Sequence, residues 1–135
     1  MTQSGDNNPA PVLAVLVNGE LQLRYDRSKP LPSHQLEYLA RMDQQMDQGI
    51  RLGTDWAEHP DASQRAQFVA MHLVESLQQG NEALVAASCS YLAERVPDLQ
   101  QVRAKTLGVG YSVELVFDKP YVDEVSVDFV PRKPE

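Results

Sequence analysis

Apolar residues run together or alternate near the start of the chain, and this pattern predicts two β-strands. Residues Val12–Val17 are apolar at every position, whereas Glu20–Asp26 places apolar side chains on one face only. The dipeptide Asn18-Gly19 separates the two runs, and it favours the type I′ turn of a hairpin because both residues tolerate a positive φ. We therefore expect a hairpin whose first strand lies inside a sheet or is covered on both sides.

The central part of the chain has apolar residues at three- and four-residue steps, which predicts three helices. Their expected ranges are 33–48, 61–79 and 81–96. We expect Ser33 to cap the first helix and Asn81 the third, while Asp61, with a glutamine three residues later, forms a capping box for the second. The segment from Gly53 to Pro60, which contains Trp56, is expected to be a loop.

The C-terminal part returns to strand-like patterns. Residues 99–107 fit a helix or a strand, and the alternation of apolar with basic residues favours a strand. Residues 111–117 and 125–129 alternate in the same way and predict two further strands. Strands at both ends and helices between them indicate an α+β fold. We expect an N-terminal hairpin, three central helices and two or three C-terminal strands, in a mainly antiparallel sheet with the helices on one face.

Length and composition indicate one globular domain. The 135 residues are 42% hydrophobic and 23% charged, which is typical of a folded protein with one core. We expect this domain over residues 12–130, with flexible tails at 1–11 and 131–135. The longest apolar run, Val12–Val17, is far shorter than the roughly 20 residues of a membrane helix. The polar start, Met1 to Asn8, does not resemble a signal peptide. A cytoplasmic location without membrane association is the resulting expectation.

The charge balance argues against nucleic-acid binding. The chain has 19 acidic and 12 basic side chains, with a net charge of -7, and this charge repels nucleic acid at long range. Only folding could form a basic patch, by bringing Arg103 and Lys105 beside Arg24 and Arg27. The single cysteine, Cys89, excludes an internal disulfide, and its place among apolar helix positions predicts a buried, unreactive thiol.

Two groups of polar residues could carry chemistry. His72 and Glu75 lie one helical turn apart and could act as metal ligands or as an acid–base pair, with help from Asp43, Asp47 or His59. A small metal-dependent or acid–base enzyme is therefore one alternative. The missing further ligands favour an exposed or interfacial histidine instead, and we expect neither a metal nor a cofactor. We interpret Asp43 and Asp47 as residues of a solvated helix face and assign no catalytic residue.

The second helix carries more apolar residues than one buried stripe requires. Phe68 and Met71 point away from that stripe, beside His72 and Glu75. These four residues are a candidate interface, because large apolar side chains on an outer helix face either pack under a second layer or bind a partner. We expect a non-enzymatic protein-binding or regulatory module that forms a homodimer through this face or a sheet edge. A small-molecule cleft near Trp56 is a further alternative.

Overall fold

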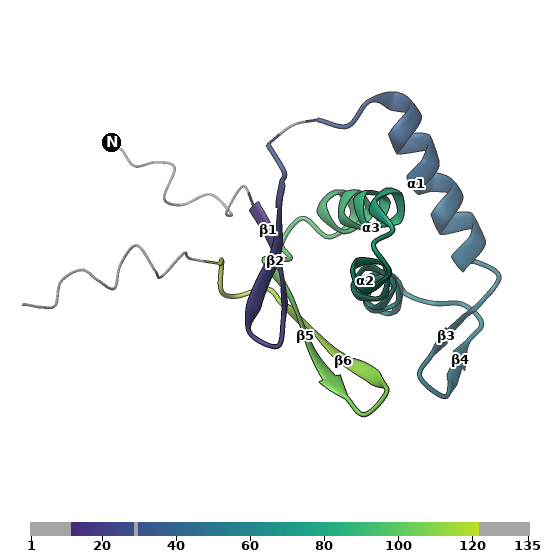
Figure 1. Cartoon of the computed structure of the whole chain (residues 1–135). Coiled ribbons are helices and arrows are strands. Elements are labelled where there is room, and N and C mark those ends of the chain that lie inside the picture. The colour runs from purple at the N-terminus through teal and green to yellow at the C-terminus, as the bar shows by residue number, and fades with distance from the viewer. Residues whose placement is uncertain (1–11, 29, 122–135) are drawn as a thin grey trace, which may run out of the picture.

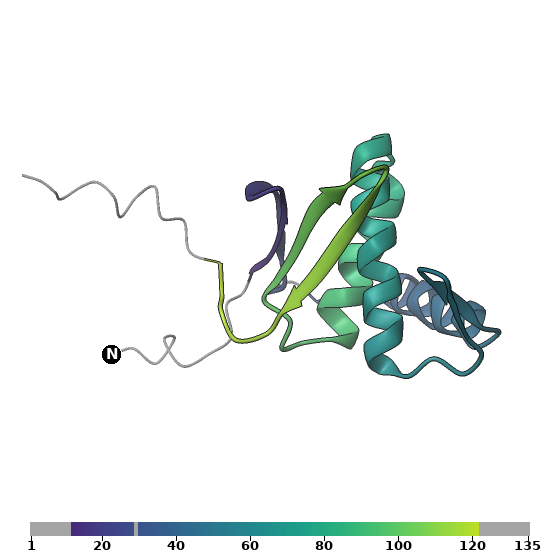
Figure 2. The same cartoon turned by 90° about the horizontal axis from the view of Figure 1, so that it is seen from below.

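A four-stranded mixed sheet with helices on one face forms the centre of the fold (Figures 1 and 2). The computed structural model describes residues 12–28 and 30–121. The predicted α+β class is confirmed, because an N-terminal hairpin, three helices and a second large hairpin follow one another along the chain. The expected tails at 1–11 and 131–135 and the expected strand at 125–129 lie outside the described residues.

The N-terminal hairpin forms as predicted. It consists of β1 (Val12–Val17) and β2 (Glu20–Asp26), joined by a turn in which Asn18 has a φ of 53° and Gly19 a φ of 82°. The strand order is β2-β1-β5-β6, so β1 lies inside the sheet. Its residues from Leu13 onward are all buried, which explains why this strand has no polar face.

The second large hairpin completes the sheet. It consists of β5 (Gln101–Leu107) and β6 (Gly110–Val116), and it confirms the strand favoured for residues 99–107. β5 pairs in parallel with β1, from Ala14 beside Gln101 to Val17 beside Ala104, while β6 is antiparallel to β5. A parallel pair needs a long crossover connection. The three helices are part of that connection.

The helices have the predicted order and nearly the predicted ends. They are α1 (Ser33–Met46), α2 (Ala62–Gln79) and α3 (Glu82–Arg95). The capping box of α2 is confirmed, because the amide nitrogen of Gln64 donates to the Asp61 carboxylate at 2.8 Å and the Asp61 amide nitrogen donates to the Gln64 side chain at 2.9 Å. Satisfying these amides fixes the start of the helix.

The expected cap at Ser33 is wrong. Pro32 is the N-cap residue of α1, with an extended backbone (φ −61°, ψ 157°), and Ser33 is the first helical residue. The side chain of Pro32 cannot accept a hydrogen bond, but its carbonyl oxygen accepts from the amide of Leu36 at 3.1 Å. The helix therefore starts without a side-chain cap.

The loop expected between α1 and α2 contains a small hairpin instead. Its strands are β3 (Ile50–Leu52) and β4 (Asp55–Ala57), which carries Trp56. The indole packs against Gly49, where a Cβ atom would come within 2.4 Å of the ring and where φ is 111°. Strands of three residues are too short for an alternating pattern, so the sequence did not reveal them.

The main core lies between the sheet and the α2–α3 pair. Its fully buried side chains include Leu13, Val15, Leu73, Leu92 and Leu99. α1 forms an outer layer on the side of α2 and α3 that faces away from the sheet (Figure 1). It contributes only Leu39 and Met46 to the buried residues. The outer helix is thus attached at few points.

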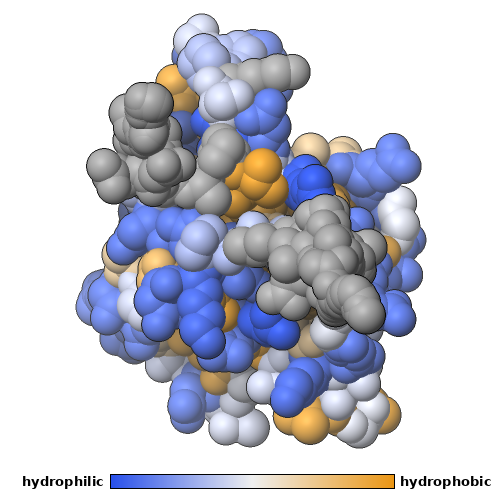
Figure 3. Space-filling model, turned by 90° about the vertical axis from the view of Figure 1, so that its left-hand side faces the viewer, coloured by the Kyte–Doolittle hydropathy of each residue, from blue (hydrophilic) through white to orange (hydrophobic). Residues whose placement is uncertain are grey.

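Among the described elements, no helix covers the opposite face of the sheet, whose coloured surface is largely hydrophilic with a group of hydrophobic residues near its middle (Figure 3). On β1, Ala14 pairs with Arg24 and Leu16 pairs with Arg103. Ala14 and Leu16 are two residues apart, so they point to the same face, and neither belongs to the core beneath the helices. Both arginines therefore lie on the outer face of the sheet. β1 separates the two arginines. Arg27 is directed elsewhere and donates to the carbonyl oxygens of Val96, Pro97 and Leu99, between α3 and β5. Of the residues named for a possible basic patch, Arg24 and Arg103 therefore share this face and Arg27 does not.

Candidate functional site

An apolar groove lies between α1 and the α2–α3 layer. Its volume is about 290 Å³, and all three helices and the start of β3 contribute to its walls. The side chains that define it are Tyr38, Met42, Met46, Phe68, His72 and Leu84. We call this hollow the α1 groove. It lies beside the points where α1 packs on the other helices, through Leu39, Met42 and Met46 and through the polar cluster described below.

The α1 groove continues into a second hollow along the first turns of α1. This hollow has a volume of about 690 Å³ and shares Tyr38 and Leu84 with the first. Together the two extend from His34 to Met46, which corresponds to about 18 Å at 1.5 Å per helical residue. The side chain of Tyr38 is 42% exposed. The walls of the second hollow are mixed, because Gln35, Glu37 and Arg41 lie there beside Tyr38 and Leu84.

The structure separates the four candidate interface residues. Phe68 and His72 line the α1 groove, with their ring centroids 4.4 Å apart and their planes tilted by 51°. Phe68 also packs against the core, as a residue beneath a second layer does. Met71 is partly buried and Glu75 is exposed, and neither lines this groove. Only half of the candidate set therefore shares one concave surface.

The geometry does not assemble a metal site around His72. Within residues 12–28 and 30–121, no three His, Cys, Asp or Glu side chains lie close enough together to hold a metal ion. Asp43 and Asp47 bind Arg65 on one side of α1, whereas His72 lines the groove. The enzyme alternative gains no support from this arrangement.

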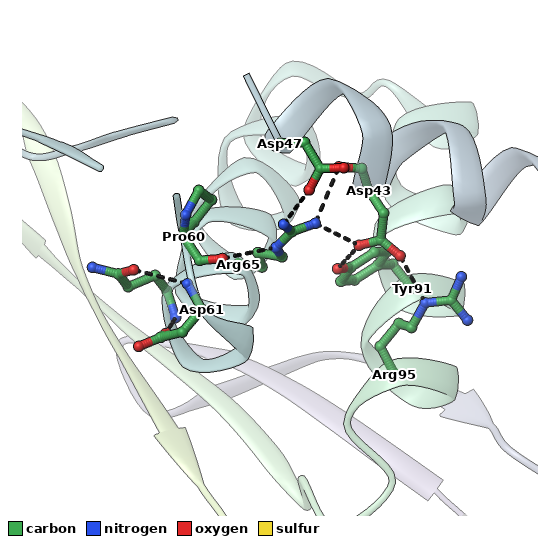
Figure 4. Close-up of polar contacts among 8 residues, drawn as sticks. Asp43, Asp47, Pro60, Asp61, Arg65, Tyr91 and Arg95 are labelled. Carbon is green, nitrogen blue, oxygen red and sulfur yellow. Dashed lines mark hydrogen bonds and ion pairs between the residues drawn. The ribbon is translucent and has the colours of Figure 1, made fainter. Parts of the chain in front are cut away.

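Asp43 is the centre of a polar cluster that ties the three helices together (Figure 4). Its carboxylate accepts hydrogen bonds from the Tyr91 hydroxyl at 2.5 Å, from Arg95 Nε at 3.0 Å and from Arg65 Nη1 at 3.3 Å. Arg65 also forms an ion pair with Asp47. We call these five residues the Asp43 cluster.

The expectation that Asp43 belongs to a solvated face is wrong. Its side chain is only 28% exposed, whereas that of Asp47 is 60% exposed. The guanidinium of Arg65 binds both carboxylates, so the repulsion between them is relieved by a cation from the protein itself. Spacing along the sequence could not show this, because Arg65, Tyr91 and Arg95 come from the other two helices.

The electrostatics of the Asp43 cluster favour a structural role. Burial alone would raise the pKa of Asp43, but the hydrogen bonds from Tyr91, Arg95 and Arg65 outweigh it, and the net pKa is lowered. The pKa of Tyr91 is raised, first by burial and then by its hydrogen bond to Asp43. Ionised Asp43 is thus held by a neutral tyrosine and two arginines. A carboxylate with three hydrogen-bond donors and a lowered pKa is a weak base rather than one poised to take a proton.

Cys89 and Trp56 lie outside the lining of the α1 groove. Cys89 is buried, as predicted, and burial raises the pKa of its thiol to about 12, so little thiolate forms near neutral pH. Trp56 is 56% exposed and does not line the α1 groove, although its neighbour Gly49 does.

Among the described helices, none has both the length and the apolar character needed to cross a membrane.

Comparisons with known protein families, with curated proteins and with solved structures found no match to this chain.

Proposed function

We propose that this protein is a protein-binding module that holds an amphipathic helix of a partner in the α1 groove. The observation that carries the proposal is the open trough along α1, whose apolar part is lined by Tyr38, Met42, Phe68 and Leu84. A solvent-open apolar groove between helices is typical of a site that receives the apolar face of another helix.

The dimensions of the trough suit a short helix. A length of about 18 Å corresponds to about 12 residues, or three turns. A helix of that length presents apolar anchors at positions i, i+3 or i+4, and i+7 along one face. Met42 and Met46 can adjust to the shape of such anchors, because the methionine side chain is unbranched and flexible.

Charge indicates which helices bind fastest. The net charge of -7 attracts a partner whose outward helix face is basic and repels an acidic one. The occupant that fits both the groove and the charge is a helix with an apolar face and lysine or arginine on its other faces. In the homodimer expected from the sequence, a second copy of this acidic chain would fill the groove instead of a partner helix.

A designed peptide tests the proposal. The probe is a helical peptide of about 14 residues with leucine at helical spacing on one face and lysine on the others. We expect it to bind and to shift the methyl NMR signals of Met42 and Met46, while Met71, outside the groove, keeps its signal. A version with glutamate in place of lysine should bind more weakly. Shifts in Met71 alone, or in no methionine, would contradict the proposal.

Two variants locate the binding site. Tyr38→Asp places a charge in the groove and is expected to weaken peptide binding at least about 10-fold. Leu107→Asp is the control, because Leu107 is 62% exposed at the turn of the β5–β6 hairpin, outside the groove lining. Equal loss in both variants would overturn the assignment. A doubled solution mass that Tyr38→Asp returns to one chain would identify a second copy as the occupant and refute the partner helix.

A further inference from the structure

His72 gives the α1 groove a side chain whose charge can change near neutral pH. It lines the groove from α2 and is exposed, with its imidazole centroid 4.4 Å from that of the Phe68 ring. Among the described residues that line this groove, only Tyr38 and His72 carry an ionisable side chain. A tyrosine phenol stays neutral at physiological pH, whereas histidine changes its charge between about pH 5 and 8. The charge of the groove wall in this range therefore depends on His72.

The elements around the histidine bring no carboxylate into the groove, as far as the described residues show. The other polar side chains of the lining are Tyr38 and Gln45 on α1 and Ser88 on α3. The start of β3 contributes only Ile50, which is apolar. A positive charge on His72 would thus be surrounded by neutral groups inside the α1 groove.

Charged residues lie close to the groove but outside its lining. On α2, Glu75 follows the histidine by one helical turn and is exposed. On β3, Arg51 follows Ile50 and is also exposed. On α1, Glu37 and Arg41 line the larger hollow and carry opposite charges. Solvent separates these groups from one another in the free protein, and none of them is placed to replace the water around the imidazole.

We propose that His72 makes the binding of a partner helix pH-dependent, an inference that rests on the function proposed above. A helix whose apolar face fills the α1 groove covers the imidazole and removes its water. This covering accepts a neutral imidazole but disfavours an imidazolium, because burying a charge without a partner is costly. The basic outward faces of the expected partner add repulsion of the same sign. The complex therefore favours the neutral form of His72.

The direction of the pH effect follows from this preference. Where the free protein carries a proton on His72 and the complex does not, binding releases that proton, so the affinity falls as the pH decreases. A single group changes the affinity by at most about 10-fold per pH unit. Between about pH 7.5 and pH 5.5, the range in which histidine titrates, we expect binding to weaken about 5- to 10-fold.

The lysine-bearing peptide described above tests this inference once its ends are acetylated and amidated. It then has no group that titrates between about pH 5.5 and 7.5. We expect its dissociation constant to rise about 5- to 10-fold over this range with the unmodified protein at constant salt. His72→Gln keeps a neutral polar side chain and should bind the peptide equally well at both pH values. Urea unfolding at both pH values checks that each protein is folded.

The other two histidines provide matched controls. His59 is exposed and lines neither hollow, so His59→Gln should retain the full pH effect. His34 lines the larger hollow one helical turn before Glu37, so a carboxylate on the same helix face can offset its positive charge. His34→Gln should therefore retain the pH effect as well.

The possible outcomes separate this inference from the proposed function. Peptide binding that is equally tight or tighter at about pH 5.5 would overturn the inference and leave the proposed function intact. A pH effect that persists in His72→Gln would also overturn it. Absence of peptide binding at both pH values would refute the proposed function and, with it, this inference.

Discussion

Replacing Asp43 with asparagine removes one charge from the centre of the Asp43 cluster and keeps the shape of the side chain. Asparagine has one acceptor oxygen where aspartate has two. It can still accept from Tyr91 or Arg65, but its amide group then faces the Nε–H of Arg95, which is also a donor. We expect the links between α1 and the other two helices to weaken, and with them the free energy of unfolding.

The size of the loss follows from the contacts. Hydrogen bonds to an ionised group contribute about 1.5–3 kcal/mol each, and more is lost when a buried partner is left unpaired. Because Asp43 is 28% exposed, water takes over part of the lost contacts. We expect Asp43→Asn to lower the free energy of unfolding by about 2–3 kcal/mol, which corresponds to about 8–12 °C in melting temperature at this chain length.

Urea unfolding at pH 7 measures this loss, and Asp47→Asn is the matched control. Asp47 lies one turn further along the same helix and also binds Arg65, but its side chain is 60% exposed. Exposed ion pairs contribute about 0–1 kcal/mol, so the control should lose no more than that. If both substitutions lowered the unfolding free energy by the same amount, the central role of Asp43 would be wrong.

The pH dependence provides an independent check. The pKa of Asp43 is lower in the folded protein than in the unfolded chain, where it is about 3.9. The stabilisation is therefore fully present above about pH 5 and is lost as the pH falls through the folded pKa. The stability difference between Asp43→Asn and the unmodified protein should shrink below about pH 4. A difference that stayed constant from pH 7 to pH 3 would refute this reasoning.

Two local features give further predictions. Gly49→Ala should lower the unfolding free energy by about 1–3 kcal/mol and alter the fluorescence of Trp56, because the new methyl group would clash with the indole at a position with a positive φ. Gly53 also has a positive φ but has open space around it. The control Gly53→Ala should therefore lower the unfolding free energy less and leave the Trp56 emission unchanged. Asp61→Ala removes the capping box of α2 and should cost about 1 kcal/mol by thermal unfolding, and an unchanged melting temperature would contradict that role.

Local features of the fold could be predicted from the sequence, because neighbouring residues determine them. The Asn18-Gly19 turn depends on two residues that tolerate a positive φ. The capping box of α2 depends on a pair of side chains three positions apart. The buried position of Cys89 followed from the apolar neighbours on its own helix.

Features that depend on the packing of distant segments could not be predicted. The Asp43 cluster joins α1 to Arg65 on α2 and to Tyr91 on α3. No local sequence pattern indicates the angles between the helices that bring these side chains together. The same reason explains the α1 groove. The sequence singled out Phe68 and His72 as unusual for an outer helix face, but it could not show that Met42 and Met46 lie opposite them.

The parallel pairing of β1 with β5 has a consequence for the newly made chain. The pairing of β1 can be completed only after Ala104, the partner of Val17, has been synthesised. At about 5–20 residues per second, this takes several seconds. During that interval an apolar strand with no polar face is exposed, and such strands aggregate readily. The nascent chain is therefore a candidate for chaperone binding at Val12–Val17 until the second hairpin emerges from the ribosome.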